Sequence, residues 1–421
     1  MIDIKHLLEY PDRYKEEMRR RGKSEEVVDT LIETYAEWKQ TQLEFEQLRS
    51  EQKGFNTEVI KLEGEAKKAA IDRMKEVSEQ VKSTESRAKQ HKELIDEFIS
   101  KIPSLTWDNI PLGKSDEDNP VIATYGEKMD YEFEPVPYWE LPFYEKTVDS
   151  EAGAKAMGAR GFYLKGDMAR FQRALFDHAL DIVLSKGFEL MYVPLMLNDT
   201  VLSGTGHLPD FDGQQYEVTI DDNKSFYLIG SSEPSIMGYY MDTNVGKLES
   251  PILNTCWSSC FRKEAGSYGK DQQGILRVHQ FEKIEMVAIA KPEETEQLFD
   301  TFGQTVREIY SSLDLHYRGV EVCSGDIPHK HFRQIDYEAW FPGVDQYREI
   351  CSNGNASDYQ NRGLRITYQD SDGSKSTPWG LNCTAVTFRT GLAIMEQFQQ
   401  ADGSIRLPQV LAERMKQEYL K

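Results

Sequence analysis

The sequence predicts an α+β protein in which an N-terminal antiparallel two-helix coiled coil precedes a domain of antiparallel strands and helices. Two observations support this prediction. Between residues 31 and 98, apolar side chains return at alternating spacings of three and four residues, as in a coiled-coil seam. Residues 256–262 alternate only loosely, but residues 275–289 are rich in β-branched and aromatic residues, and a charged loop that contains glycine lies between them, as in a β-hairpin.

Length and charge limit the classes of function. A chain of 421 residues is long enough for two or three domains with a substantial core. The net charge of -21 argues against binding nucleic acid over the whole surface. A local basic stripe stays compatible with that charge, because phosphate contacts depend on nearby Lys and Arg rather than on the total.

The sequence predicts a cytoplasmic protein without disulfide bonds. The amino terminus lacks the apolar stretch of a signal peptide, and the longest apolar run, Met286 to Ala290, is far too short to span a bilayer. The cysteines are odd in number and scattered along the chain. Cys256 and Cys260 have no second pair of Cys or His at ligand spacing, so we expect no zinc site.

The N-terminal hundred residues predict a short helix and then a long helical hairpin. The short helix opens after Pro11 and ends at Gly22. Two apolar stripes follow, Leu31 to Leu62 and Met74 to Phe98, with Gly64 between them and no proline until Pro103. We expect a domain over 1–103 with a hairpin over about 29–101, a linker over 104–126 and a second domain over 127–421. From this pattern alone, the hairpin is either a packing or dimerising device or a binding arm.

The stretch 256–289 predicts two strands whose polar side chains suit a nucleotide. Arg262, at the end of the first strand, is a fixed cation with a planar fork of donors for phosphate oxygens. In the second strand, expected over 275–289, the period of two places Phe281, Lys283 and Glu285 on one face. A phosphate-binding cation, a flat ring and an acid indicate a nucleotide bound next to an ammonium group. The alternative is an ordinary hairpin with a surface salt bridge.

Three stretches resemble the motifs of one enzyme family. Phe261-Arg-Lys-Glu, a loop and Arg277-Val-His-Gln-Phe-Glu-Lys-Ile-Glu resemble motif 2 of the class II aminoacyl-tRNA synthetases, with wording similar to that of the seryl-tRNA synthetases. An expected helix over 168–186 and a strand over 188–194 look like motif 1, which builds a dimer interface in the family. Residues 381–394 are like motif 3. The resemblance implies an antiparallel sheet flanked by helices over 127–421, and a homodimer.

The resemblance also implies an ATP site. Arg262 is expected to hold the α-phosphate, Arg389 the γ-phosphate, and Phe281 to stack under adenine, while Glu264 reads the adenine amino group. Glu349 and Ser352 match the positions that hold Mg²⁺ against the phosphates. Their three-residue spacing puts them on opposite faces of a strand, so a bulge or strand end is needed between them. The full expected set is Arg262, Lys263, Glu264, Val278, Phe281, Glu349, Ile350, Cys351, Ser352 and Arg389.

The resemblance implies L-serine as the amino acid, with several departures from the family pattern. Ser231-Ser232-Glu233 stands where the family has Thr-Ala-Glu, and Asn382-Cys383-Thr384 where many members read Asn-Gly-Ser. His207 replaces a usual Gln. These changes leave room for a specialised copy. The serine-binding residues are expected to be Ser231, Ser232, Glu233, Arg262, Glu285, Asn382 and Thr384.

In this family the N-terminal hairpin embraces the long variable arm of the cognate tRNA, which implies tRNA(Ser) as a partner. The expected contacts are basic residues near the hairpin tip, Lys53, Lys61, Lys67, Lys68, Arg73, Lys75 and Lys82. The implied function is a seryl-tRNA synthetase. One alternative is a synthetase-derived protein with a binding or regulatory role, and another is a ligase that charges a carrier protein.

Overall fold

The computed structural model describes residues 1–421 except 60–61, 211–212, 222–223 and 265–272. The chain divides into two compact units. One unit is Ile2–Pro103, and the other is Ser104–Lys421 together with Met1. Across the described residues, no helix combines the length and the apolar character that a bilayer crossing requires.

In its described residues the N-terminal unit contains the α-helices α1 (Ile4–Glu9), α2 (Pro11–Arg20), α3 (Glu26–Glu58) and α4 (Gly64–Lys101). Helix α2 begins at Pro11 as predicted, where the missing N–H of proline costs no hydrogen bond. Helix α1 was not predicted. Its start is fixed by Asp3, whose carboxylate accepts hydrogen bonds from the backbone N–H groups of Lys5 and His6.

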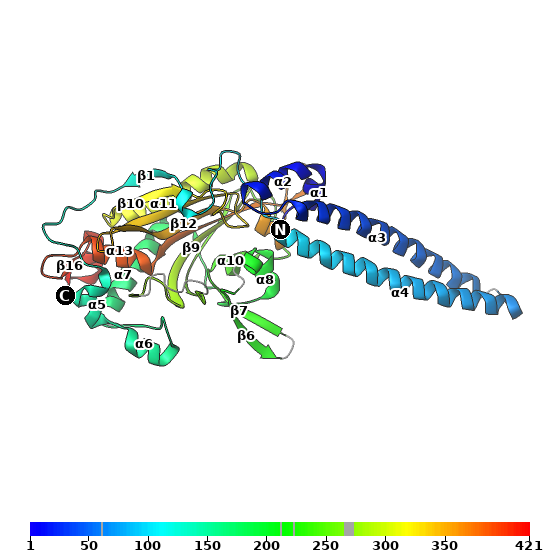
Figure 1. Cartoon of the computed structure of the whole chain (residues 1–421), viewed down its shortest axis with the longest axis horizontal. Helices are drawn as coiled ribbons and strands as arrows, with labels where there is room; N and C mark the ends of the chain where they lie inside the picture. Colours follow the sequence, from blue (N-terminus) through cyan, green and yellow to red (C-terminus); the bar gives the residue numbers. More distant parts are fainter. Residues whose placement is uncertain (60–61, 211–212, 222–223, 265–272) are drawn as a thin grey trace. The chain divides into compact units, whose positions relative to one another are not determined.

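Helices α3 and α4 form the predicted antiparallel coiled coil (Figure 1). Their seam buries Phe45, Val77 and Val81 in one apolar cluster. Ion pairs cross the seam at its exposed edges, with Arg87 Nη2 lying 2.9 Å from a Glu44 carboxylate oxygen. Helix α4 starts at Gly64, whose φ of +63° is a conformation that glycine adopts without strain.

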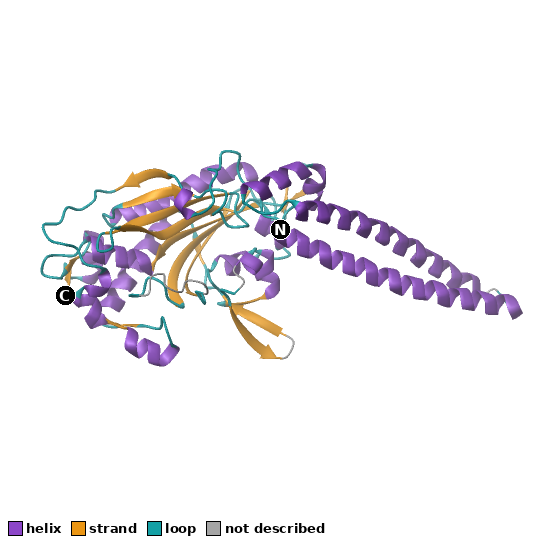
Figure 2. Ribbon diagram, in the orientation of Figure 1, coloured by secondary structure: helices purple, strands orange, loops and turns teal. Residues whose placement is uncertain are grey.

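The larger unit is built on an eight-stranded sheet in the order β1-β10-β11-β12-β15-β9-β8-β4. Every neighbouring pair is antiparallel except β4 and β8, which are parallel. Helices flank this sheet, which confirms the predicted α+β class (Figure 2). The strands are β1 (Val121–Tyr125), β4 (Glu189–Leu190), β8 (Ile252–Phe261), β9 (Gln280–Ala290), β10 (Tyr317–Glu321), β11 (Arg333–Phe341), β12 (Gln346–Asn355) and β15 (Trp379–Thr387).

Two predicted strands have the wrong bounds. The strand expected over 275–289 begins only at Gln280, because the N–H groups of Ile275 and Leu276 donate to the hydroxyl of Tyr138, each at 3.0 Å, instead of joining the ladder. The strand expected over 188–194 is reduced to Glu189–Leu190. It has one neighbour, β8, and Pro194, which has no N–H, lies beyond it.

The main core lies between the sheet and the helices α7 (Asp167–Ser185), α11 (Thr295–Ser312) and α13 (Phe388–Gln397). Phe171 and Phe302 are among the largest side chains in that core. The other helices of this unit are α5 (Pro142–Thr147), α6 (Ser150–Met157), α8 (Asp199–Gly204), α9 (His207–Asp210), α10 (Glu233–Tyr239), α12 (Tyr359–Gly363) and α14 (Gln409–Met415).

Short strands complete the unit. A three-stranded sheet has the order β5-β7-β6, and three two-stranded ribbons pair β2 with β3, β13 with β14 and β16 with β17. Their bounds are β2 (Val148–Asp149), β3 (Tyr163–Leu164), β5 (Met196–Asn198), β6 (Tyr216–Asp221), β7 (Lys224–Leu228), β13 (Tyr368–Gln369), β14 (Lys375–Ser376), β16 (Ile405–Arg406) and β17 (Tyr419–Leu420).

Candidate active site

A cavity of about 560 Å³ lies over the central strands β12, β15 and β9. Most of the residues predicted for ATP and serine line it. Those that line it are Ser231, Glu233, Arg262, Glu264, Val278, Phe281, Glu349, Ile350, Cys351, Ser352, Asn382, Thr384 and Arg389. Three predicted residues do not line the cavity, namely Ser232, Lys263 and Glu285.

One half of the cavity carries cations and a flat ring. The Arg262 guanidinium lies 5.4 Å from the centre of the Phe281 ring, and its Nε donates to the carbonyl of Gly230 at 3.2 Å. Glu264 lies beside it with a positive φ of 52°, and its carboxylate is 3.3 Å from Arg277 Nη1. Lys263 turns away from the cavity, with its ammonium 5.9 Å from the ring of Tyr216. The loop residues 265–267 of the motif lie outside the described residues.

Arg389 is held in the wall of the cavity near the start of α13. Its Nε donates to the carbonyl of Leu276 at 3.2 Å and its Nη1 to the carbonyl of Glu349 at 3.1 Å. Burial lowers the pKa of Arg389 from its ordinary value, and Glu349 opposes that shift. Arg277 lines the same cavity and was missed by the sequence analysis, although it opens the motif stretch. Together these arginines make this half suited to a polyphosphate.

The expected bulge between Glu349 and Ser352 is present. On β12, Cys351 pairs with Tyr337 and Glu349 with Glu338, so Ile350 is an extra residue on its strand. The bulge brings both Glu349 and Ser352 to the cavity wall.

Carboxylate and hydroxyl oxygens at this wall suit Mg²⁺, which proteins hold through one or two carboxylates while substrate phosphates complete its shell. Asp336, opposite Ser352 on β11, adds a partly buried acid that was not predicted. Burial, followed by Glu349, raises the pKa of Asp336 well above its usual range. A cation at this place therefore meets the carboxyl and hydroxyl oxygens of Glu349 and Ser352, which fits the implied metal.

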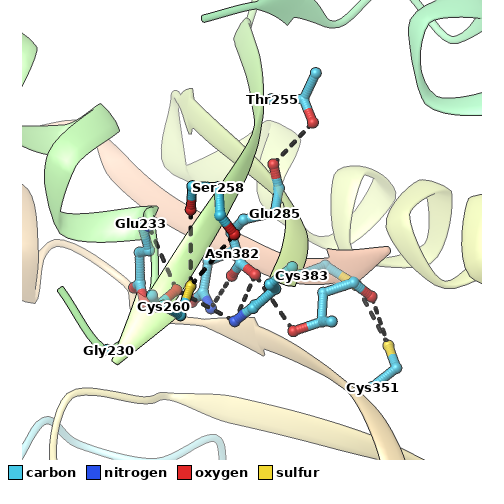
Figure 3. Close-up of polar contacts among 12 residues, drawn as sticks. Gly230, Glu233, Thr255, Ser258, Cys260, Glu285, Cys351, Asn382 and Cys383 are labelled. Atoms are coloured by element: carbon cyan, nitrogen blue, oxygen red, sulfur yellow. Dashed lines mark hydrogen bonds and ion pairs between the residues drawn. The ribbon is translucent and has the colours of Figure 1, made fainter. Parts of the chain in front are cut away.

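The other half of the cavity is built around Glu285 (Figure 3). This side chain has no exposed surface, because three groups cover its carboxylate. Asn382 Nδ2 donates to Oε1 at 3.1 Å, Thr384 Oγ1 donates to Oε2 at 3.3 Å, and Lys283 Nζ lies 2.6 Å from Oε2. Lys283 also donates to Ser231 Oγ at 3.2 Å. Burial alone lowers the pKa of Lys283, but Glu285 reverses this and the net shift is upward.

A second buried acid, Glu233, lies at the start of α10. Lys330 Nζ lies 2.7 Å from both of its oxygens, Gln360 Nε2 donates to Oε1 at 2.8 Å, and His207 Nε2 is 3.4 Å from Oε2. Burial raises the pKa of Glu233, yet Lys330 and His207 together hold it well below its usual range. Ser232, the next residue back, is wholly buried and does not reach the cavity.

Lys330 and His331 were missed by the sequence analysis, because they lie in a loop before β11 without a motif of their own. His331 Nε2 lies 3.1 Å from Asn382 Oδ1. Because His331 follows Lys330 in the chain, this contact links the residues around Glu233 with those around Glu285. Burial, followed by Lys330, lowers the pKa of His331 to about 4, and the same two causes lower the pKa of His207 to about 4.

The basic residues predicted for RNA are exposed where the structure describes them. Lys53 lies on α3, and Lys67, Lys68, Arg73, Lys75 and Lys82 lie on α4. Arg73 Nη2 lies 3.1 Å from Glu51, so part of its charge is neutralised within the hairpin. Lys61 lies outside the described residues.

Sequence models of two families match the chain. The Seryl-tRNA synthetase N-terminal domain matches residues 1–106, and the tRNA synthetase class II core domain (G, H, P, S and T) matches residues 216–398. A curated serine–tRNA ligase of Rhodococcus opacus is 35% identical over 421 residues, with 100% of each chain covered. One of Campylobacter hominis is 36% identical, covering 98% of this chain and 100% of the relative.

Solved structures agree with these matches. The seryl-tRNA synthetase of Pyrococcus horikoshii, complexed with ATP, aligns with a TM-score of 0.90 at 30% identity and covers 100% of this chain and 99% of its own. The cytoplasmic serine–tRNA ligase of Naegleria fowleri, in complex with AMP, aligns with a TM-score of 0.83 at 28% identity, covering 98% and 95%.

Proposed function

Because this chain belongs to the seryl-tRNA synthetase family, we propose that it activates L-serine with ATP to seryl-adenylate and transfers the seryl group to the 3′ end of tRNA(Ser). It is an ATP-dependent aminoacyl-tRNA ligase. The observation that carries this proposal is a single cavity with two halves, one lined by arginines and the other built on a buried, hydrogen-bonded acid.

In the first step the serine carboxylate attacks the α-phosphorus of ATP and pyrophosphate leaves. Negative charge concentrates on the phosphoryl oxygens, so positioned cations supply most of the catalysis. Arg262 binds the α-phosphate and the serine carboxylate together, and its contact with Gly230 fixes its orientation. Arg389 binds the γ-phosphate.

The remaining nucleotide contacts follow from the same wall. Adenine lies on the Phe281 ring, where the Arg262 guanidinium already stacks, and Glu264 accepts from the adenine amino group. Glu349 and Ser352 would hold Mg²⁺, which would neutralise phosphate charge there.

In the other half, Glu285 is the acid for serine. Its carboxylate is covered by the Lys283 ammonium, which also bonds Ser231. The serine ammonium takes the place of the Lys283 ammonium, so one positive charge replaces another and Glu285 stays paired. Ser231, Asn382 and Thr384 supply hydrogen bonds to the amine and hydroxyl. A site built to bond a hydroxyl rejects substrates that lack one by roughly four to five orders of magnitude.

The hairpin α3–α4 is the tRNA-binding part of an N-terminal domain over 1–103, with exposed Lys and Arg near its tip for the variable arm. Two further properties follow the family. The enzyme is a homodimer through the segment of α7 and β4, where Leu190 is 50% and Tyr192 98% exposed. It works in the cytoplasm, where its five buried, free cysteines stay reduced.

Exchange of ATP with pyrophosphate, measured with each of the twenty amino acids, tests the first step. Serine should be the best substrate for exchange. In a separate aminoacylation assay, the enzyme should then charge tRNA(Ser) with serine. If threonine or proline supports the fastest exchange, the assignment of the amino-acid pocket is wrong.

A further inference from the structure

The Glu233 carboxylate has all its hydrogen-bonding positions filled by protein groups. Lys330 contacts both oxygens, Gln360 donates to one and His207 approaches the other. The residue is 2% exposed, and Lys330 is 4% exposed. Although Glu233 lies at the cavity wall, it has little capacity left for a substrate amine.

These contacts join segments that are remote in sequence. Glu233 begins α10, Lys330 precedes β11, Gln360 lies on α12, and His207 begins α9. Gln360 also donates to the carbonyl of Thr205 at 2.9 Å, and His207 Nδ1 lies 3.0 Å from the Thr205 hydroxyl. These four side chains, called the Glu233 cluster, therefore hold residues 205–207 in a fixed position against the start of α10.

Two chains of contacts link the Glu233 cluster to the groups proposed to bind serine. The backbone N–H of Glu233 donates to Ser231 Oγ at 3.4 Å, two residues before it. Lys330 is followed directly by His331, which contacts the Asn382 amide, and that amide donates to Glu285. A shift of Glu233 or Lys330 therefore moves Ser231 and Asn382 together.

We infer that Lys330 is a positioning residue of the amino-acid pocket, which acts through Glu233 on Ser231 and through His331 on Asn382. The inference rests on the proposed function, since it concerns the serine half of that site. It places Glu233 behind the serine contacts, as the anion that Lys330 neutralises, and not among them.

The charge balance gives this role a distinctive signature. Removing the Lys330 ammonium leaves the Glu233 carboxylate buried without its main partner, which is far more costly than removing the whole pair. The groups that face Glu233 are Lys330, His207, His331 and Gln360, and Arg262 faces His207. Without Lys330, proton uptake by Glu233 or by either histidine restores neutrality, so the defect should shrink as the pH falls.

The test uses the full chain and compares Lys330→Met, Lys330→Arg and the double variant Lys330→Met/Glu233→Gln. A matched control is Arg333→Met, which breaks the pair between Arg333 and the 5%-exposed Glu321, whose atoms lie 2.9 Å apart. KM for serine and KM for ATP are measured by pyrophosphate exchange at about pH 8 and about pH 6, after circular dichroism confirms folding.

For Lys330→Met we expect KM for serine to rise by at least about tenfold at the higher pH while KM for ATP changes less than about threefold. The rise should shrink at the lower pH. The double variant, which buries a neutral pair, should recover most of the lost affinity, as should Lys330→Arg. Arg333→Met should leave both KM values near those of the parent.

Several results would overturn the inference. They are an unchanged KM for serine in Lys330→Met, equal rises for serine and ATP, or a double variant as impaired as the single one. If Lys330→Met does not fold, the double variant is the test. It should fold, with a KM for serine within about tenfold of the parent's, and a larger rise would overturn the inference. A parent enzyme that shows no serine-dependent exchange would instead overturn the proposed function, and this inference with it.

Discussion

Glu285→Gln keeps the size of a wholly buried side chain and removes its charge. The Lys283 ammonium, 2.6 Å from Oε2 in the free enzyme, then loses its anion, and the serine ammonium that replaces it lacks the same partner. Both side chains of the pair are at most 9% exposed, so water screens their interaction little. Removing one partner of such a buried pair costs about 3–5 kcal/mol. Lys283 can relieve part of that cost by losing its proton, which favours the lower end.

This cost predicts that kcat/KM for serine falls by about two to three and a half orders of magnitude. KM for ATP should change less than about threefold, because the described residues that contact the Glu285 carboxylate are Lys283, Asn382 and Thr384, which are not among those proposed to bind the nucleotide. Pyrophosphate exchange with serine or ATP varied in turn separates the two constants.

Glu321→Gln is the matched control, since Glu321 is also buried and ion-paired on the same sheet. It should leave both constants near those of the parent. A Glu285→Gln enzyme that loses ATP affinity and keeps its affinity for serine would refute the reasoning and move this acid to the nucleotide.

Three further outcomes are expected. Because the Ser231 hydroxyl and Glu285 suit a small hydroxylated side chain, serine should support exchange far better than alanine, glycine or threonine, and a parity between serine and alanine would contradict this. Removing residues 29–101 should leave pyrophosphate exchange within several-fold of the parent and lower tRNA charging by orders of magnitude. Charging by the parent should weaken as the salt concentration rises, because phosphate contacts hold the tRNA. An equal loss in both assays would mean that the hairpin supports the core. Burial and Lys330 lower the pKa values of His207 and His331 to about 4, from an ordinary value of 6.5. The unfolded chain therefore takes up these protons first as the pH falls, so going from about pH 7 to about pH 5 should lower the free energy of unfolding by about 2 kcal/mol per histidine. Urea denaturation at both values measures this, and His207→Gln should show the smaller loss.

The sequence by itself determined the features that depend on local periodicity. The coiled coil of α3 and α4 follows from a seam in which near neighbours in sequence set the repeat. The shared face of Phe281, Lys283 and Glu285 follows from the period of two in a strand, and the bulge at Ile350 from the spacing of Glu349 and Ser352. Arg262 and Arg389 of the nucleotide half were predicted from the family motifs that contain them, whereas Arg277 was not.

The tertiary structure decided what depends on partners far away in the chain. Glu233 and Lys330 are 97 residues apart, and no local pattern indicates that they meet in a buried ion pair. Tyr138 holds Ile275 and Leu276 across more than a hundred residues and so sets where β9 begins. The Lys283 ammonium covers Glu285 because burial leaves that acid no water to bond, so the nearest cation must pair with it. Such pairings minimise the cost of buried charge over the whole fold, and that cost is defined only once distant segments have packed together.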